Sequence, residues 1–183
     1  MPRRWLKRVL PDVERYRDTR VAKLLGPRLF HPALWHLNRR SVAGAVAIGM
    51  FCGLIPGPLQ MLGAGIGAVW FKRNLPVSLI TTLYTNPVTI VPLYVLAFQI
   101  GALVLGAHHV MPPAPVFAGV APAQWMAMLG DWTLALGKPL LIGVPLLAMS
   151  LAAVGYWVVH LGWGLYLRQV LRRRRRARGP GSN

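Results

Sequence analysis

The sequence predicts an all-α integral membrane protein, a small helical bundle whose apolar helices are broken by proline and in part re-entrant. Two apolar segments, 42–71 and 75–106, exceed the about 18 residues that indicate a membrane-spanning helix, and each contains proline near its middle. The basic residues flank these segments. Of the 21 Lys and Arg residues, 11 lie in 1–40 and seven lie in 168–178. This distribution is typical of the cytoplasmic ends of membrane proteins.

The net charge of +17 therefore predicts anionic lipid headgroups as partners, and not nucleic acid. A nucleic-acid-binding protein would carry its basic residues on a folded polar face. We expect three regions. Residues 1–40 form a basic amphipathic N-terminal region, 41–167 form the membrane domain, and 168–183 form a basic disordered tail. A solvated tail is the alternative for the start of the chain. Ser41 is the expected N-cap of the first membrane helix.

The first apolar segment, 42–71, has halves of unsuitable length for a simple crossing. Residues 42–55 and 59–71 would form helices of about 21 and 20 Å, while the hydrocarbon core of a bilayer is about 30 Å thick. A hairpin that enters and leaves by the same face fits both lengths and places the flanking basic residues on one side. The alternative is a single span with a strong kink.

The rest of the membrane domain follows from this choice. Segment 75–106 would cross outward, 107–139 would be an outer loop, and 140–167 would cross back. Both termini would then be cytoplasmic in a multi-pass protein of a bacterial inner membrane. Within the loop, helical spacing after Pro122 predicts a short interfacial helix or a second shallow re-entrant piece: Trp125, Met128, Leu129, Trp132, Leu136. Three segments make a thin bundle, so a homo-oligomer is compatible with the sequence.

Residues that could carry catalysis are scarce. The stretch 42–106 holds no Asp, Glu or His, so it offers no general acid or base. His31 and His36 are five residues apart, which is a poor spacing for two metal ligands on one helix, and Cys52 is the only cysteine. We therefore expect no enzyme activity, no cofactor and no metal.

The candidate binding site lies at the two breaks. Proline removes an amide donor and frees its neighbours from helical hydrogen bonds, which is tolerated at membrane depth only where protein or water satisfies the freed groups. Paired interrupted helices are the best sequence indicator of a transport site. The candidate substrate-binding residues are Pro56, Pro58, Gln60, Thr85, Asn86, Pro87 and Thr89, with Arg39, Arg40, Lys72 and Arg73 gathering an anionic headgroup. The alternative is that the Thr and Asn side chains only cap the broken helices.

Two stretches of this chain resemble a bacterial family. HPALWHLNRRSVAGAVAIGMFCGLIPGPLQM and NLPVSLITTLYTNPVTIVPLY are similar to members of domain of unknown function 2062, and the resemblance extends over roughly residues 20–170. Its most specific parts are Pro56-x-Pro58-x-Gln60-Met61 and Thr85-Asn86-Pro87-x-Thr89. The resemblance implies a small inner-membrane protein and no particular activity or cofactor.

Two functions fit these observations. The first is a transporter or flippase-like protein for an anionic lipid or phosphate-bearing substrate, with the breaks as its site. The alternative is a non-catalytic membrane scaffold that recruits partners through its basic termini.

Overall fold

The computed structural model describes residues 31–106 and 110–177, with side chains up to Val170, and this part of the chain is helical without strands. The all-α prediction is thus confirmed for the described residues. The expected amphipathic segment in 1–30 lies outside them. Of the expected disordered tail 168–183, residues 168–177 are helical and continue the last helix, and the residues from 178 onward lie outside the described part. The elements in order are η3 (Pro32–Leu34), α3 (Arg39–Cys52), α4 (Leu59–Trp70), α5 (Leu75–Thr82), α6 (Ile90–Leu105), α7 (Pro122–Ala135) and α8 (Gly137–Ala177).

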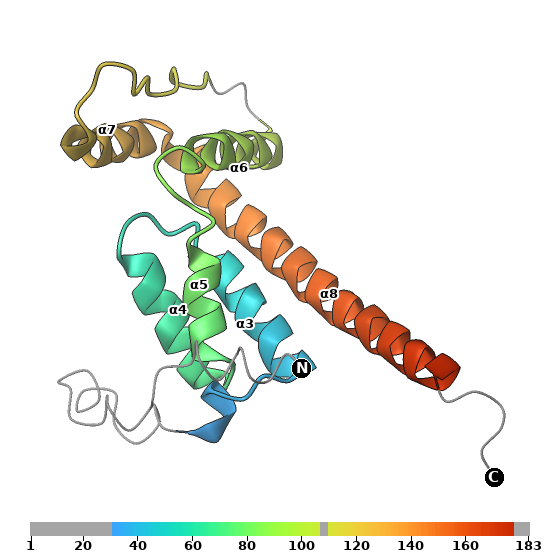
Figure 1. Cartoon of the computed structure of the whole chain (residues 1–183). Helices are drawn as coiled ribbons and strands as arrows, with labels where there is room; N and C mark the ends of the chain where they lie inside the picture. Colours follow the sequence, from blue (N-terminus) through green and yellow to red (C-terminus); the bar gives the residue numbers. More distant parts are fainter. Residues whose placement is uncertain (1–30, 107–109, 178–183) are drawn as a thin grey trace, which may run out of the picture.

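Helices α3, α4 and α5 form a three-helix unit in which the chain runs up, down and up again (Figure 1). Asparagine begins two of them. The Asn38 Oδ1 atom accepts from the Ser41 amide at 2.7 Å, and the Asn74 Oδ1 atom accepts from the Val77 amide at 3.0 Å. The expectation that Ser41 caps α3 is therefore wrong. Asn38 has the extended backbone of an N-cap, and its side chain reaches the third residue of the helix.

Small residues let these three helices approach closely. A Cβ atom at Gly49 of α3 would lie 2.5 Å from the Ser78 carbonyl oxygen of α5. The fully buried Ser78 hydroxyl donates to the Ala64 carbonyl of α4 at 3.2 Å. Gly67 of α4 also faces α3, because a Cβ atom there would lie 2.9 Å from the Ile48 side chain. Gly67 thus allows α4 to approach α3 closely. Gly65 has open space beside it.

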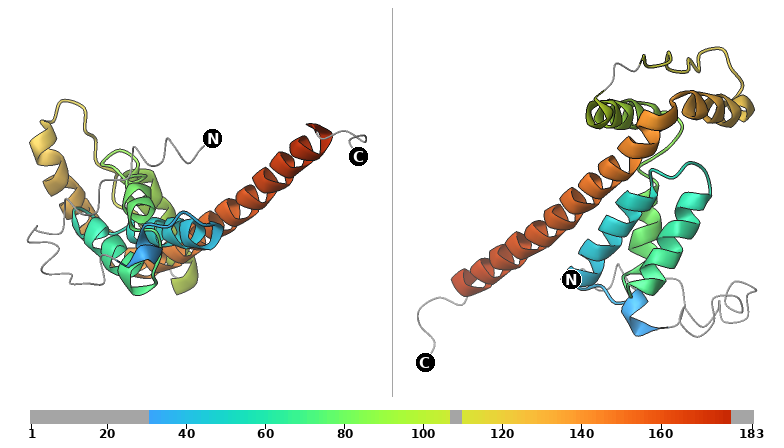
Figure 2. Two further views of the ribbon diagram at one scale, coloured as in Figure 1. Left: turned by 60° about the horizontal axis from the view of Figure 1, so that its bottom comes forward. Right: turned by 180° about the vertical axis from the view of Figure 1, so that it is seen from behind.

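Helices α6 and α7 lie crosswise to the three-helix unit, at the end of the molecule where α8 begins (Figures 1 and 2). Segment 75–106 therefore forms two helices with different directions, α5 and α6, and not one continuous helix (Figure 1). The main hydrophobic core lies here. It joins residues of α6, α7 and the first part of α8 to Leu54, which belongs to the first break. The other buried core residues are Ile90, Tyr94, Ala97, Phe98, Leu129, Trp132, Leu136, Leu140, Leu147 and Ala148.

Helix α8 runs from this core past α3 and ends on the side where α3 begins (Figure 2). Its part Gly137–Val170 is the one helix in the described ranges that is long and apolar enough to cross a membrane. Of the most apolar 18-residue stretch of this helix, 22% is buried inside the protein, so most of the apolar surface of the helix faces outward. Helices α4 and α6 are apolar but shorter. The predicted helix in the outer loop is α7, and it ends where Gly137, with φ of 58°, starts α8.

Candidate functional site

The two ends of the first broken segment meet at the start of α3. The Arg73 Nη1 atom donates to the Arg40 carbonyl oxygen at 3.1 Å. Next to it, the fully buried Asn74 donates from its side chain to the His36 carbonyl oxygen at 3.4 Å. Helices α3 and α4 thus form a hairpin whose basic ends are adjacent.

The other end of this hairpin is the first break, between Cys52 and Leu59. When α3 stops, backbone carbonyls near its C-terminus lose their helical partners. Three hydroxyl groups from the second broken segment donate to three of these carbonyls. Tyr84 donates to Met50 at 2.8 Å, Thr85 donates to Gly53 at 2.6 Å, and Tyr94 donates to Leu54 at 2.8 Å. The second segment therefore satisfies the backbone that the first break frees.

The second break, between Thr82 and Ile90, is closed by its own side chains. The Asn86 Oδ1 atom accepts from the amides of Val88 and Thr89, both at 2.9 Å. In return the Thr89 hydroxyl accepts from the Asn86 amide at 2.9 Å and donates to the Tyr84 carbonyl at 2.9 Å. This reciprocal arrangement resembles a capping box, and it closes the turn that leads into α6 at Ile90.

Both breaks border one cavity of about 670 Å³, which α7 closes on the far side. Thr85 joins the breaks across it, since its hydroxyl lies 2.9 Å from Gln60 Oε1. The cavity lining is apolar apart from a few amide and hydroxyl groups, and it contains no charged side chain. The lining residues are Pro56, Gly57, Pro58, Gln60, Thr85, Asn86, Pro87, Ile90, Met126, Leu129, Gly130, Thr133 and Leu134.

The structure divides the predicted site residues between two places. Pro56, Pro58, Gln60, Thr85, Asn86 and Pro87 line the cavity together, although the two breaks are well separated in sequence. Thr89 lies beside it in the α6 cap. The four predicted headgroup residues lie at the opposite end of α3 and α4: Arg39, Arg40, Lys72, Arg73. Helix α3 has 14 residues, so about 20 Å separates the two places.

Sequence reasoning missed the contribution of α7 to the cavity. Its helical spacing was recognisable, but no pattern linked Met126 or Thr133 to the breaks. The described residues contain no cluster of three His, Cys, Asp or Glu side chains that could hold a metal ion. In the same residues Asp131 on α7 is the only acidic side chain. The cavity can therefore hold an apolar or neutral part of a ligand by shape, and an anion only through amide and hydroxyl groups.

The comparison with protein families gives one result. Residues 22–174 match the model of a bacterial family described as "Uncharacterized protein conserved in bacteria (DUF2062)". The chain belongs to this family. The match covers both breaks, the cavity and the basic ends of the hairpin, and it confirms the resemblance found in the sequence. No curated protein and no solved structure matches the chain.

Proposed function

We propose that this chain is a multi-pass protein of the bacterial inner membrane that binds a phosphate-bearing lipid and moves it across the bilayer, as a transporter or flippase does. The observation that carries the proposal is the meeting of two interrupted helices at one cavity. Paired interrupted helices mark substrate sites in transporters, and ligand pockets have volumes of about 300–1,000 Å³. The cavity, at about 670 Å³, is of that size.

In this proposal α3 and α4 are a re-entrant hairpin. Their lengths of 14 and 12 residues correspond to about 21 and 18 Å, which is less than the about 30 Å of a hydrocarbon core. The contact of Arg73 with the Arg40 backbone holds the two basic ends next to each other, which supports a hairpin that enters and leaves by the same face. The cavity at the tip of the hairpin would then lie within the bilayer, where freed backbone groups must find protein partners.

The membrane placement has its own test. Lys72 is exposed in the turn after α4, so in a Cys52→Ala background the variant Lys72→Cys offers a single accessible thiol. We expect an impermeant thiol reagent to leave it unlabelled in intact cells and to label it after lysis. Val116→Cys, at a 70% exposed position of the loop, is the positive control for outside labelling. Labelling of Lys72→Cys from outside would contradict the re-entrant hairpin.

The substrate site is tested at Asn86, because its side chain closes the turn before α6 and also lines the cavity. Asp and Ser side chains also accept hydrogen bonds from backbone amides two and three residues on, so Asn86→Asp and Asn86→Ser both keep the turn, and only Asn86→Asp adds a negative charge. The new carboxylate and a substrate phosphate about 6 Å from it would repel each other by about 3 kcal/mol at an effective dielectric constant of about 20. In proteoliposomes with a labelled anionic lipid, we expect Asn86→Asp to slow translocation at least about tenfold and Asn86→Ser to change it less than about twofold. Equal rates for both variants and the parent would count against a substrate site here.

The alternative function is a membrane scaffold, and one observation favours it. The hydroxyls of Thr85 and Thr89 and the side chain of Asn86 all bond to the backbone of the breaks, so a structural role accounts for them without a ligand. A scaffold that acts through its basic termini would lose function when residues 168–183 are removed. It would be insensitive to substitution of Gln60 and Asn86.

A further inference from the structure

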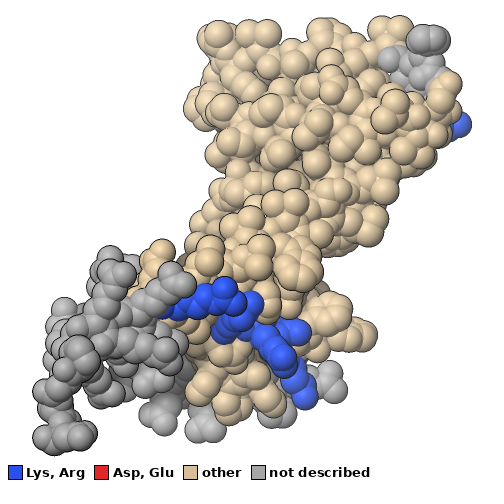
Figure 3. Space-filling model, turned by 90° about the vertical axis from the view of Figure 1, so that its right-hand side faces the viewer, with Lys and Arg blue, Asp and Glu red and all other residues tan. Residues whose placement is uncertain are grey.

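The basic residues at the start of α3 form a cluster that spans two helix interfaces, and we call Arg39, Arg40 and Arg73 the arginine cluster. Figure 3 shows Lys and Arg side chains gathered in one band at this end of the molecule. The Arg73 side chain lies over Gly44 of α3, where a Cβ atom would be 2.8 Å from it. The Arg39 guanidinium lies over Gly164 of α8, where a Cβ atom would be 3.7 Å from its Nη2 atom. Gly44 thus leaves room for the Arg73 side chain, and Gly164 places α8 in contact with the Arg39 guanidinium.

The arginine cluster has no acidic partner in the described part of the chain. Asp131 is the only acidic side chain there, and it lies on α7, at the other end of the molecule. Three guanidinium groups at the N-terminus of α3, which itself carries partial positive charge, repel one another unless an anion joins them. The cluster therefore has the electrostatics of an anion site.

Two buried nitrogen atoms lie at the contact between the arginine cluster and α8. Arg39 Nε and His160 Nδ1 are both buried and lack a hydrogen-bond partner among the described residues. A buried polar atom without a partner is costly and calls for an explanation. The His160 ring is held by its neighbours, stacked on Tyr156 with centroids 5.6 Å apart and edge-on to Trp157 at 5.9 Å. His160 lies one helical turn before Gly164, the residue of α8 that the Arg39 guanidinium contacts.

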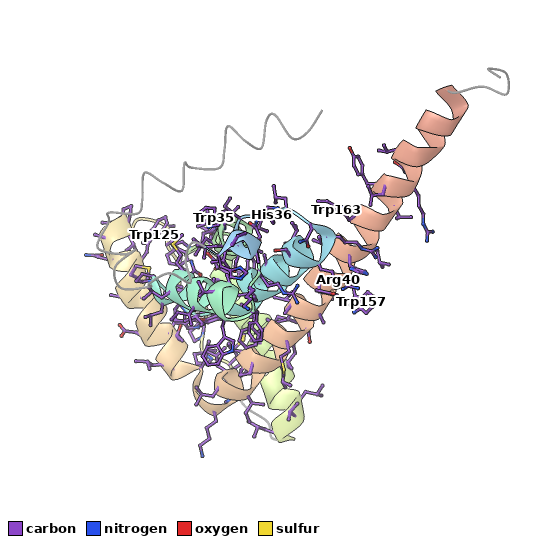
Figure 4. The ribbon with its side chains drawn as sticks, turned by 90° about the horizontal axis from the view of Figure 1, so that it is seen from below. Trp35, His36, Arg40, Trp125, Trp157 and Trp163 are labelled. Carbon is purple, nitrogen blue, oxygen red and sulfur yellow. The ribbon has the colours of Figure 1, made fainter. Side chains whose placement is uncertain are left out.

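The surface next to the arginine cluster is apolar. On α8, Trp157 and Leu161 are each 57% exposed and Val158 is 64% exposed. Figure 4 shows Arg40 on α3 beside the part of α8 that carries Trp157 and Trp163. Charge and apolar surface therefore adjoin where α3 meets α8, which is the arrangement that a phosphate head with an attached hydrocarbon chain requires.

We propose that the arginine cluster and His160 bind the phosphate of one membrane lipid, with its chain along Trp157 and Leu161 of α8. Because the cluster supplies three uncompensated positive charges, it favours a phosphomonoester headgroup, which carries up to two negative charges, over a phosphodiester with one. The inference rests on the membrane placement proposed above and not on translocation. Binding here would hold the start of α3 against α8 whether or not a lipid crosses.

The test measures lipid binding by the full chain in nanodiscs of phosphatidylcholine that contain a small fraction of labelled phosphatidic acid or labelled phosphatidylglycerol. Charge-assisted hydrogen bonds are among the stronger ones in proteins, so we expect Arg39→Gln to weaken phosphatidic acid binding about tenfold or more. Lys138→Gln removes the same charge at the other end of α8 and should change binding less than about twofold. The parent protein should prefer phosphatidic acid to phosphatidylglycerol.

A second pair of variants keeps every charge. Gly164→Leu fills the space under the Arg39 guanidinium, whereas Gly162→Leu, two residues earlier on α8, meets nothing within 4 Å. We expect the first to weaken phosphatidic acid binding and the second to leave it unchanged. Equal losses in Arg39→Gln and Lys138→Gln would overturn the site in favour of general charge attraction. Competition by inorganic phosphate at the concentration of the lipid would overturn the lipid as ligand, and equal binding of both lipids would overturn the phosphomonoester preference. None of these results depends on the translocation assay.

Discussion

The crossing of α6 and α8 gives the sharpest prediction about stability. At Gly143 of α8 a Cβ atom would overlap the carbonyl group of Ala97 and lie 3.1 Å from the Gly101 amide nitrogen, both on α6. At Gly101 a Cβ atom would likewise overlap the Pro139 carbonyl. The two backbones are thus in direct contact. Because backbone atoms cannot rotate away as a side chain does, the variant Gly143→Ala must push the helices apart.

The expected magnitude follows from two opposing effects. Overpacking of a core costs about 1–3 kcal/mol, and the upper value applies where backbone opposes backbone. Replacing glycine inside a helix by alanine returns about 1 kcal/mol. The net loss is about 2 kcal/mol, and for a chain of this size it lowers the melting temperature by about 4–8 °C.

The matched control is Gly162→Ala on the same helix, where nothing lies within 4 Å of the added Cβ atom. This control should raise the free energy of unfolding by up to about 1 kcal/mol and the melting temperature by about 2–4 °C. The assay is heating of the detergent-solubilised protein followed by size-exclusion chromatography of the part that stays monodisperse. If Gly143→Ala melts at or above the temperature of Gly162→Ala, the close backbone contact between α6 and α8 is refuted.

Two further predictions concern the breaks and the hairpin turn. Thr85→Val removes the hydroxyl that donates to the buried Gly53 carbonyl, so we expect a loss of about 1–3 kcal/mol in thermal unfolding. The control Thr133→Val removes a hydroxyl that bonds within its own helix, to the Leu129 carbonyl, and should cost less than about 0.5 kcal/mol; similar losses would refute the bridge between the breaks. Lys72 has φ of 51°, a left-handed conformation that costs a non-glycine residue about 1–2 kcal/mol, so Lys72→Gly should stabilise by about 0.5–1 kcal/mol. Lys72→Ala keeps the strain and should not stabilise, and a gain as large as that of Lys72→Gly would point to charge as the cause.

Local sequence signals located the main features of this fold. Proline predicted the interruption between Cys52 and Leu59 and the one before Ile90, and helical spacing after Pro122 predicted α7. The lengths of the two halves of segment 42–71 and the basic residues that flank it predicted that the ends of this segment lie side by side. The hydrogen bond from Arg73 to the Arg40 carbonyl oxygen confirms this. These features depend on residues near one another in the chain.

Long-range pairings could not be predicted in the same way. Nothing in the sequence specifies that the Tyr94 hydroxyl reaches the Leu54 carbonyl, 40 residues earlier, or that α7 covers the cavity between the breaks. The single predicted site is two separate places in the structure, because the full length of α3 lies between Arg39 at its start and the first break, next to Gln60, at its end. One missed signal was present: small or proline residues four apart on each partner, Ala97 with Gly101 and Pro139 with Gly143, are typical of closely packed apolar helices.

The order of synthesis gives the bonds between the breaks a consequence for membrane insertion. Met50, Gly53 and Leu54 leave the ribosome before the hydroxyls that later bond to their carbonyls, the last of which belongs to Tyr94. In hydrocarbon, each carbonyl without a partner costs several kcal/mol, about as much as the stability of a small domain when three are summed. The proposed hairpin therefore cannot enter lipid alone. A nascent chain arrested before residue 94 should remain crosslinked to the insertion machinery, and it should be released to lipid only after the second segment has joined it.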